Sequence, residues 1–163
     1  MLGVIGDKNR YDSTVISDSV NTASRMEGLT KTFGASVIVS EKTLLELEAI
    51  KEGDTLKVSP SLNHRFLGKV QVKGKNKALK IYDFYGGDTP STQQLKTKTK
   101  ATFEQGIQHY FDRQFGKAAE CFKQVLAENE VDIAAQFYLD KAVQYIVDGV
   151  RDNWSGVEEM VAK

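Results

Sequence analysis

Short apolar runs alternate with amphipathic stretches over the first half of the chain. Residues 1–6 and 13–17 each read as a strand, and the polar segment between them reads as a turn. Apolar residues then recur at helical spacing, and Asp18 or Ser19 can cap this helix. Gly34 is well suited to end it, because helices often finish on a glycine.

The same alternation continues as far as residue 86. Residues 35–40 read as a short strand, and Ser40 can cap the amphipathic helix that follows. Residues 64–86 read as two strands around the basic turn KGKNK. The resulting order of strands and helices predicts an α+β fold, in which helices pack on one face of a mixed sheet.

The pattern changes after Gly87. Residues 88–100 are polar and contain Pro90, which predicts a linker or the lead into a helix. Residues 101–163 have helical spacing and predict an all-α region. We therefore expect one unit over residues 1–87, a linker over residues 88–100, and a helical unit over residues 101–163.

Three residues of the helical region fit a known kind of repeat. Gly106, Ala118 and Phe122 occupy the small, small and aromatic positions of a helical hairpin of the tetratricopeptide kind. The proline expected at the end of the second helix is absent. The length allows one repeat and a trailing helix, so we predict a single tetratricopeptide-like hairpin.

Composition limits the partners and the compartment. Lys and Arg together number 22, as do Asp and Glu, so the charge balance gives no indication of a nucleic-acid partner. The apolar runs are far too short to span a bilayer. Cys121 is the only cysteine, so an internal disulfide is impossible, and its apolar setting predicts a core residue. These features favour a cytoplasmic protein.

The helix predicted after residue 18 carries the first candidate site. Asn21 and Arg25 are four residues apart, so they share one face of the helix. Arginine offers a planar fork of donors for phosphate oxygens, and asparagine offers a donor and an acceptor for a sugar. The pair could hold a nucleotide at its sugar and phosphate. The spacing also fits, and by itself favours, a solvated helix face with an ordinary surface arginine.

A basic turn between the last two predicted strands offers the second candidate. Lys73, Lys75 and Lys77 surround Gly74, and a lysine on such a turn can approach a phosphate closely. The turn also fits a simpler role, in which its charges keep a hairpin soluble and protect an edge strand.

No metal site is assigned from the residues themselves. His64 and His109 are far apart, no Cys/His cluster has zinc spacing, and we interpret both histidines as structural. Asp12 and Asp18 could pass for a pair of metal-binding carboxylates. A helix cap explains Asp18 better, and a turn or strand entry explains Asp12 better.

Taken in order, these features resemble the second half of a class III adenylate/guanylate cyclase catalytic domain. The residues that carry the resemblance are Gly3, Gly6, Arg10, Asp12, Thr14, Asp18, Val20, Asn21, Ala23, Arg25, Met26 and Glu27. The segment FLGKVQVKGKNKALKIYDF resembles the terminal hairpin of that domain. The resemblance covers residues 1 to about 86 and implies an incomplete ferredoxin-like domain. The segment NWSGV resembles the ending of helical regions that follow some bacterial cyclase domains.

The resemblance implies a role for each candidate residue. Asn21 would orient the ribose, and Arg25 would stabilise charge on the α-phosphate in the transition state, which makes these two the catalytic candidates. Thr14, Asp18 and Lys73 would bind the nucleotide, with Thr14 at the purine and Lys73 at the terminal phosphates. The reaction would convert ATP into cyclic AMP and pyrophosphate, with GTP as the less favoured substrate.

The chain also departs from the family pattern. The two metal-binding aspartates of the family and its purine-reading lysine would precede Met1, and Ser17 and Ser13 replace a glycine and an aromatic residue. Mg²⁺ or Mn²⁺ would therefore need ligands from the missing half or from a partner domain, in the head-to-tail dimer that the family implies. We expect a partial chain that is inactive alone and cytoplasmic, even where the parent protein is anchored to a membrane.

Two other interpretations of the helical region stay open. In one, the chain is a non-enzymatic interaction module whose tail binds a protein or peptide in a groove. In the other, the tail packs against the catalytic domain or dimerises it, because its aromatic residues must be buried against something.

Overall fold

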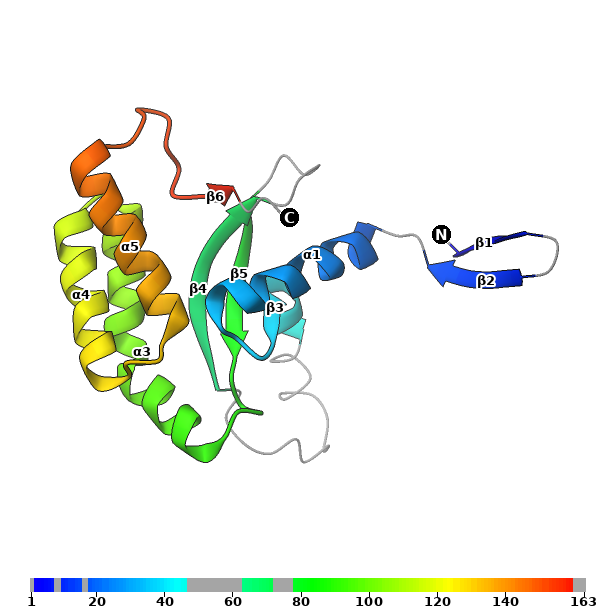
Figure 1. The fold of residues 1–163 in the computed structure, drawn as a ribbon, viewed down its shortest axis with the longest axis horizontal. Helices are drawn as coiled ribbons and strands as arrows, with labels where there is room; N and C mark the ends of the chain where they lie inside the picture. Colours follow the sequence, from blue (N-terminus) through cyan, green and yellow to red (C-terminus); the bar gives the residue numbers. More distant parts are fainter. Residues whose placement is uncertain (1, 8–9, 16–17, 47–62, 72–77, 160–163) are drawn as a thin grey trace.

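The computed structural model of this chain describes residues 2–7, 10–15, 18–46, 63–71 and 78–159, with side chains from Ala23 onward except those of Arg25 and residues 158–159. The strands are β1 (Leu2–Asp7), β2 (Arg10–Val15), β3 (Ile38–Ser40), β4 (His64–Gln71), β5 (Leu79–Phe84) and β6 (Glu158–Glu159). The helices are α1 (Asp18–Phe33), α3 (Pro90–Phe111), α4 (Phe115–Glu128) and α5 (Ile133–Asp148), with further helical residues at 41–46. Figure 1 shows α3, α4 and α5 on one side of the β3–β5–β4 strands, with α1 crossing near β3.

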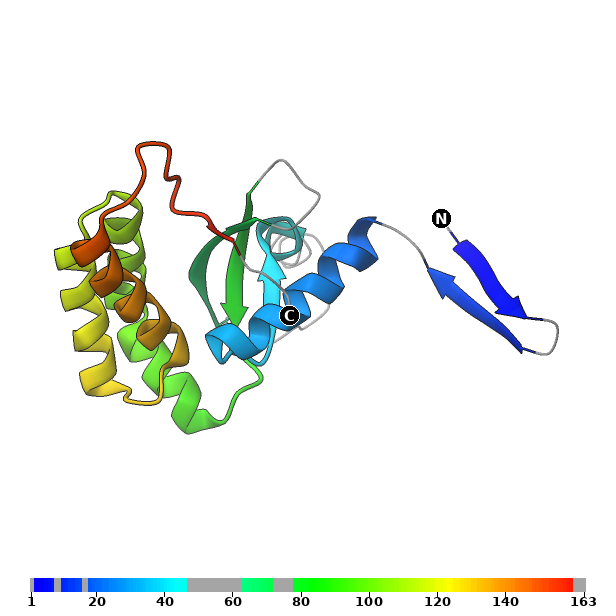
Figure 2. The same cartoon turned by 45° about the horizontal axis from the view of Figure 1, so that its top comes forward.

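The strands form two sheets. β1 and β2 pair as an antiparallel hairpin, which extends away from the other elements in Figures 1 and 2. The main sheet has the strand order β3-β5-β4-β6. β5 is antiparallel to both β3 and β4, whereas β6 joins β4 in parallel, so the main sheet is mixed. The predicted α+β class is confirmed.

β4 and β5 present two different faces. Because successive side chains of a strand point to opposite sides, Ile81 and Asp83 are buried on one face while Tyr82 between them is half-buried on the other. Leu67 of β4 and Ile81 belong to the same core as residues of α1, α3 and α5. The buried face of the main sheet is therefore the face that meets the helices.

A bulge in β4 lets the helices come close. The register between β4 and β5 shifts between Phe66 and Gly68. Gly68 has φ of 135°, which side chains rarely allow, and a Cβ atom there would lie 2.3 Å from the hydroxyl oxygen of Tyr138. Tyr138 fills that space and donates a hydrogen bond to the carbonyl oxygen of Leu67 at 2.6 Å. The glycine thus allows α5 to touch the strand.

Two predicted helix boundaries are confirmed. α1 is followed by Gly34, which has φ of 59°. The N–H of Ala35 donates to the carbonyl oxygen of Thr30 at 3.0 Å, which is the closing bond of a Schellman motif. The next helical segment is capped by Ser40, whose hydroxyl accepts a hydrogen bond from the N–H of Thr43 at 3.2 Å.

The three helices after Gly87 form a tail that shares its core with the sheet. α3 packs on α4, and α4 packs on α5. Their shared interior is aromatic and contains Phe103, Tyr110, Phe122 and Tyr138. The same cluster continues into α1 and β4, so the aromatic residues of the tail are buried against the first half of the chain.

Residues 88–100, for which the sequence offered a linker or the lead into a helix, are mostly helical. Residues 90–100 belong to α3. Thr89 caps the helix by accepting a hydrogen bond from the N–H of Thr92, and Pro90 lies at the first turn, where its missing N–H removes no helical bond. Lys96 and Thr99 are buried although they are polar, which is why composition did not reveal the helix.

The end of the chain also differs from the prediction. Residues 101–163 were expected to be all-α, but the chain returns to the main sheet, where Glu158 and Glu159 pair with Val70 and Gln71 of β4. The ring of Trp154 packs on Tyr110, with centroids 5.4 Å apart.

Among the described helices, none combines the length and the apolar character needed to cross a membrane.

Gly106 tests the packing of α3 on α4. A Cβ atom there would lie 2.8 Å from Cε1 of Phe122 and 3.1 Å from Cβ of Cys121. We expect Gly106→Ala to lower the free energy of unfolding, because overpacking costs about 1–3 kcal/mol and exceeds the gain of about 1 kcal/mol in helix propensity. Urea unfolding followed by circular dichroism measures the change.

Gly116 of α4 provides the matched control. A Cβ atom there would meet nothing within 4 Å, so Gly116→Ala should stabilise the chain through helix propensity alone. A stabilising Gly106→Ala would show that the two helices are further apart than described.

Candidate functional site

α1 carries both catalytic candidates. It runs from Asp18, which was expected as a cap and is instead the first helical residue, to Phe33. Asn21 and Arg25 are therefore one turn apart on a regular helix, and their Cα atoms lie in one row along it. The side chains of both residues lie outside the described part of the structure.

The predicted nucleotide-binding residues are spread over three places. Asp18 is the first residue of α1, one turn from Asn21. Thr14 lies in β2, opposite Gly3 of β1. Lys73 lies outside the described residues, in the segment between β4 and β5. The backbone thus groups Asp18 with the catalytic candidates and leaves Thr14 on the separate hairpin.

A hollow of about 320 Å³ lies between α1 and β3. Its α1 side is a row that includes Ala23, Met26 and Thr30. A helix turns by about 100° per residue, so Asn21 and Arg25 fall in a different row of α1. The hollow and the predicted nucleotide contacts therefore belong to different sides of the helix.

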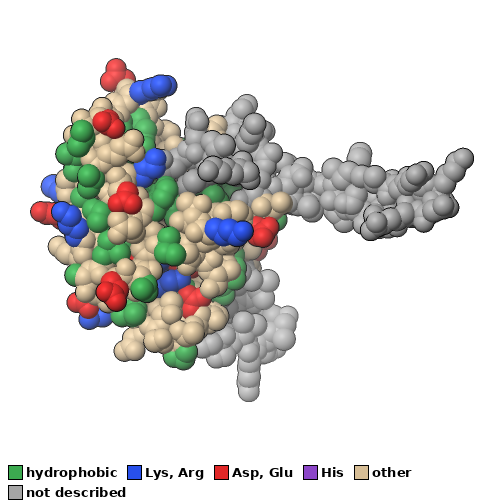
Figure 3. Space-filling model, viewed as in Figure 1, with side chains coloured by type: hydrophobic (Ala, Val, Ile, Leu, Met, Phe, Trp, Pro, Cys, Tyr) green, Lys and Arg blue, Asp and Glu red, His purple; other side chains and the backbone are tan. Residues whose placement is uncertain are grey.

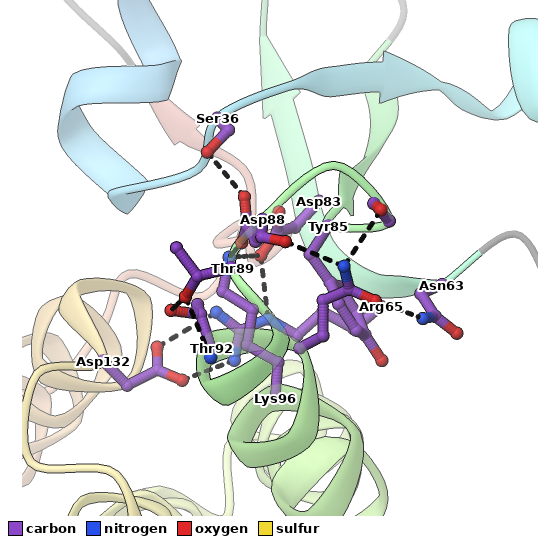
Figure 4. A network of polar contacts seen from close by, with 12 residues as sticks. Ser36, Asn63, Arg65, Asp83, Tyr85, Asp88, Thr89, Thr92, Lys96 and Asp132 are labelled. Atoms are coloured by element: carbon purple, nitrogen blue, oxygen red, sulfur yellow. Dashed lines mark hydrogen bonds and ion pairs between the residues drawn. The ribbon is translucent and has the colours of Figure 1, made fainter.

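A buried cluster of charges joins the main sheet to the tail (Figure 4). Arg65 of β4 is 1% exposed, and its Nε atom donates to Asp83 of β5 at 3.1 Å. Its two terminal nitrogens donate to the two carboxylate oxygens of Asp132 at 2.6 and 3.0 Å. The guanidinium carbon also lies 4.4 Å from the centroid of the Phe103 ring. Arg65 is therefore held from β5, α3 and the start of α5 together.

The charge on Arg65 is maintained by these partners. Burial lowers the pKa of the Arg65 guanidinium, but hydrogen bonds and charges from Asp132 and Asp83 raise the pKa by more. The guanidinium consequently stays protonated inside the protein.

Asp132 has a second role at the start of α5. It is the N-cap of the helix, and its Oδ1 atom accepts a hydrogen bond from the N–H of Ala135 at 3.1 Å. Its Oδ2 atom accepts from the side-chain amide of Asn129 at 3.2 Å. Because the same carboxylate binds Arg65, one group fixes both the cap of α5 and its attachment to the sheet.

Lys96 and Asp88 extend the cluster to the end of α1. The Lys96 ammonium lies 3.0 Å from Oδ2 of Asp83 and 2.8 Å from Oδ2 of Asp88. The other oxygen of Asp88 accepts a hydrogen bond from the hydroxyl of Ser36 at 2.6 Å. Ser36 lies three residues beyond α1, so the charged cluster reaches the turn that follows the candidate helix.

The sequence contains a partial signal for this cluster. Arg65 and Asp83 each interrupt an apolar strand at a position that alternates inward, and an inward charge needs a buried partner. Lys96 had no such signal, because it lies in the polar segment that predicted a linker.

The remaining candidates have structural surroundings. Cys121 is buried, and burial, with a contribution from Glu120, raises the pKa of its thiol, as expected for a core residue. His64 packs edge-on against Tyr82, with ring centroids 5.8 Å apart, and His109 lies in the last turn of α3. In the described parts of the chain, no three His, Cys, Asp or Glu residues are grouped so that they could hold a metal ion.

The chain is similar to three proteins named as adenylate cyclases. "Adenylate cyclase" from Anabaena cylindrica is 39% identical over 84 residues, which is 51% of this chain and 15% of that protein. "Adenylate cyclase 1" from Rhizobium meliloti is 35% identical over 86 residues, 53% of this chain and 11% of that protein. "Adenylate cyclase, terminal-differentiation specific" from Dictyostelium discoideum is 27% identical over 146 residues, 90% of this chain and 6% of that protein. No family model and no solved structure matches the chain.

These similarities support a relationship to a cyclase family. The chain spans between 6% and 15% of the length of the three relatives. The alignment with the Dictyostelium protein covers 146 residues, more than residues 1–87 can hold, so it continues into the helical tail.

The buried arginine allows a first test of how the tail is attached. Arg65→Met keeps a long side chain but leaves Asp83 and Asp132 without their shared counter-charge. We expect the free energy of unfolding to fall by about 3–5 kcal/mol, the usual result of breaking a buried ion pair from one side. Chemical denaturation of the full chain measures the loss.

Lys98→Met is the matched control. Lys98 pairs with Glu128, and both side chains are more than half exposed, so the loss should be less than about 1 kcal/mol. Equal losses in the two variants would contradict a special role for the buried cluster.

The ion pair of Asp88 with Lys96 should make the stability of the chain depend on pH. Burial raises the pKa of Asp88, but hydrogen bonds from Lys96 and Ser36 and the charges of Lys96 and Arg65 lower it by more, so the pKa lies below its ordinary value of 3.8. The stabilisation from Asp88 is complete above pH 3.8 and is lost as the pH falls towards the lower pKa of the folded state.

Asp88→Asn should therefore lose less stability than the unmodified chain as the pH falls below 3.8. Thermal unfolding at a series of pH values measures this, and Asp140→Asn, at an exposed carboxylate of α5, is the charge-matched control. Parallel pH profiles for Asp88→Asn and the unmodified chain would refute the prediction.

Proposed function

We propose that this chain is part of a class III nucleotide cyclase and supplies the asparagine and arginine of its active site. The observation that carries the proposal is α1, a regular helix with Asn21 and Arg25 one turn apart, in a chain similar to three adenylate cyclases. The spacing of Asn21 and Arg25 alone would also fit a solvent-exposed helix face that binds no ligand. The similarity to three cyclases makes the catalytic interpretation the better one.

The reaction is an internal phosphoryl transfer on ATP. The 3′-oxygen of the ribose forms a bond to the α-phosphorus, the bond from that phosphorus to the oxygen shared with the β-phosphate breaks, and pyrophosphate leaves with the bonding electrons. The proton of the 3′-hydroxyl is released. The products are cyclic AMP and pyrophosphate.

Asn21 and Arg25 divide the work of positioning and charge stabilisation. Asn21 orients the ribose through its amide, and Arg25 donates to α-phosphate oxygens as negative charge develops on them. In this proposal Asp18 and Thr14 contact the nucleotide. The side-chain oxygen of Thr14 accepts a hydrogen bond from the adenine amino group. Lys73 contacts the terminal phosphates. Enzymes that catalyse phosphoryl transfer rely on positioning and electrostatic stabilisation rather than on a covalent enzyme intermediate.

Mg²⁺ or Mn²⁺ enters the proposal only through another domain. The described residues offer no group of carboxylates or histidines that fits a metal ion, so no step is assigned to a metal bound by them. When bound, the ion would lower the charge of the phosphates. A second cyclase domain, placed head to tail, would hold it, and the chain alone would be inactive.

The tail belongs to the catalytic unit in this proposal. Its tetratricopeptide-like pattern at Gly106, Ala118 and Phe122 also suggested an interaction module. However, the inner surfaces of α3 and α5 are covered by the sheet through Phe103, Tyr138 and the Arg65 cluster, which leaves no inner groove there for a peptide. On the surface of the tail that is in view in Figure 3, apolar side chains are interspersed with charged ones. Packing against the cyclase half is therefore favoured over a separate binding function.

A complementation assay tests the proposed function. The full chain is mixed with ATP, Mg²⁺ or Mn²⁺, and a cyclase domain that keeps its metal-binding aspartates but has lost its own asparagine and arginine. We expect cyclic AMP from the mixture and none from either partner alone. Arg25→Ala should lower the rate by about 10²–10³-fold, the usual loss when a donor to developing charge is removed.

Lys31→Ala is the control, because Lys31 is an exposed basic residue of the same helix. It should leave the rate unchanged. Product that survives Arg25→Ala would refute the role of Arg25, and no product from a folded, unmodified chain would refute a competent half-site.

A further inference from the structure

The tail rests directly on the C-terminal end of α1. Phe33, the last residue of α1, is 1% exposed. Its ring centroid lies 5.2 Å from that of Phe137 and 6.0 Å from that of Tyr138, both on α5. Gly34 follows, and a Cβ atom there would lie 2.7 Å from the Ile133 side chain. The first turns of α5 therefore occupy the space beside the end of α1.

Tyr138 connects this contact to the sheet. Its ring stacks near Phe33, and its hydroxyl donates to the carbonyl oxygen of Leu67 in β4 at 2.6 Å. The side chain is 1% exposed, and the missing side chain of Gly68 makes room for it. A displacement of α5 would consequently move α1 relative to β4.

A second contact holds α1 from a different helix of the tail. Ser36, in the turn after α1, donates to Asp88, and Asp88 also binds Lys96 of α3 (Figure 4). The end of α1 is thus fixed by an apolar contact from α5 and by a polar contact reaching α3. Two contacts in different directions restrict the tilt of a helix, whereas one contact restricts only its position.

A change in the tilt of α1 would displace Arg25, because Arg25 lies far along the helix from the end that the tail contacts. Arg25 is eight residues before Phe33, which is about 12 Å along a helix that rises about 1.5 Å per residue. A tilt of about 5° at Phe33 would displace the backbone of Arg25 by about 1 Å over that length. A misplacement of about 1 Å can cost a catalytic group about 10²-fold in rate.

We propose that the tail is a positioning element for the catalytic helix, with Phe33 and Tyr138 as the positioning residues that set the orientation of Asn21 and Arg25. The proposal rests on the proposed function of those two residues. It assigns to the tail a role in the reaction rate without any contact with the nucleotide.

Two variants test the contact from opposite sides. Tyr138→Phe removes only the hydroxyl that binds Leu67, and Phe33→Leu removes the aromatic contact but keeps an apolar side chain. Tyr145→Phe is the matched control, because Tyr145 lies on the same helix and packs on Tyr110 and Trp154 within the tail.

Hydrogen–deuterium exchange of the full chain without nucleotide is the first readout. Tyr138→Phe and Phe33→Leu should each raise the exchange of α1 amides by about two- to tenfold, the shift expected from the loss of one hydrogen bond or a contact of similar strength, while β5 stays protected. Tyr145→Phe should leave α1 unchanged. Unchanged α1 exchange in both test variants, or equal loosening of α1 in the control, would overturn the proposal.

The complementation assay is the second readout. The two test variants should lower kcat by about tenfold or more and leave KM for ATP nearly unchanged, because Arg25 acts mainly in the transition state. A normal kcat in both variants, with Arg25→Ala still strongly slowed, would overturn the positioning role and leave the proposed function standing. An Arg25→Ala variant with an unchanged rate would refute the proposed function, and the positioning role with it.

Discussion

The described structure depends on the buried guanidinium of Arg65. Arg65 lies in the interior face of β4, where an unpaired guanidinium would be strongly unfavourable. Its partners come from β5 through Asp83 and from the start of α5 through Asp132. Because Asp132 also caps α5, the position of that helix is set by the charge it neutralises. The placement of Tyr138 beside Leu67, and of Phe33 beside Tyr138, follows from where α5 begins.

Apolar packing and the ion cluster make different contributions to this arrangement. The aromatic core provides the driving force, since each large apolar side chain stabilises the fold by about 1.5–3 kcal/mol when buried. The hydrophobic effect has no preferred direction of its own. The ion cluster carries a desolvation cost that offsets much of its attraction, but its hydrogen bonds are satisfied in only one alignment. We interpret the charges as the part that selects the orientation of the tail.

Local patterns in the sequence were sufficient for local structure. The end of α1 at Gly34 and the cap at Ser40 follow from signals within a few residues, and the structure contains both. The sequence left residues 90–100 open between a linker and the lead into a helix, because the buried side of this segment carries Lys96, whose charged partner Asp83 lies on another element. The strand β6 was not predicted because it consists of two glutamates, which have no alternating apolar pattern that would indicate a strand. For the candidate site, the sequence placed Asn21 and Arg25 on one helix but could not indicate what holds that helix in place.

The position of Arg65 argues against a tail that was simply added to a complete domain. A sheet that had evolved to be covered by apolar helices alone would carry an apolar residue in the middle of its buried face. Here that face carries an arginine and an aspartate, and the bidentate partner of the arginine comes from the tail. The alignment with the Dictyostelium protein runs through both parts, as expected if they evolved together. Without the tail, Arg65 would keep Asp83 of β5 as a partner but would lose the bidentate carboxylate of Asp132, which leaves two of its nitrogens without their charged acceptors.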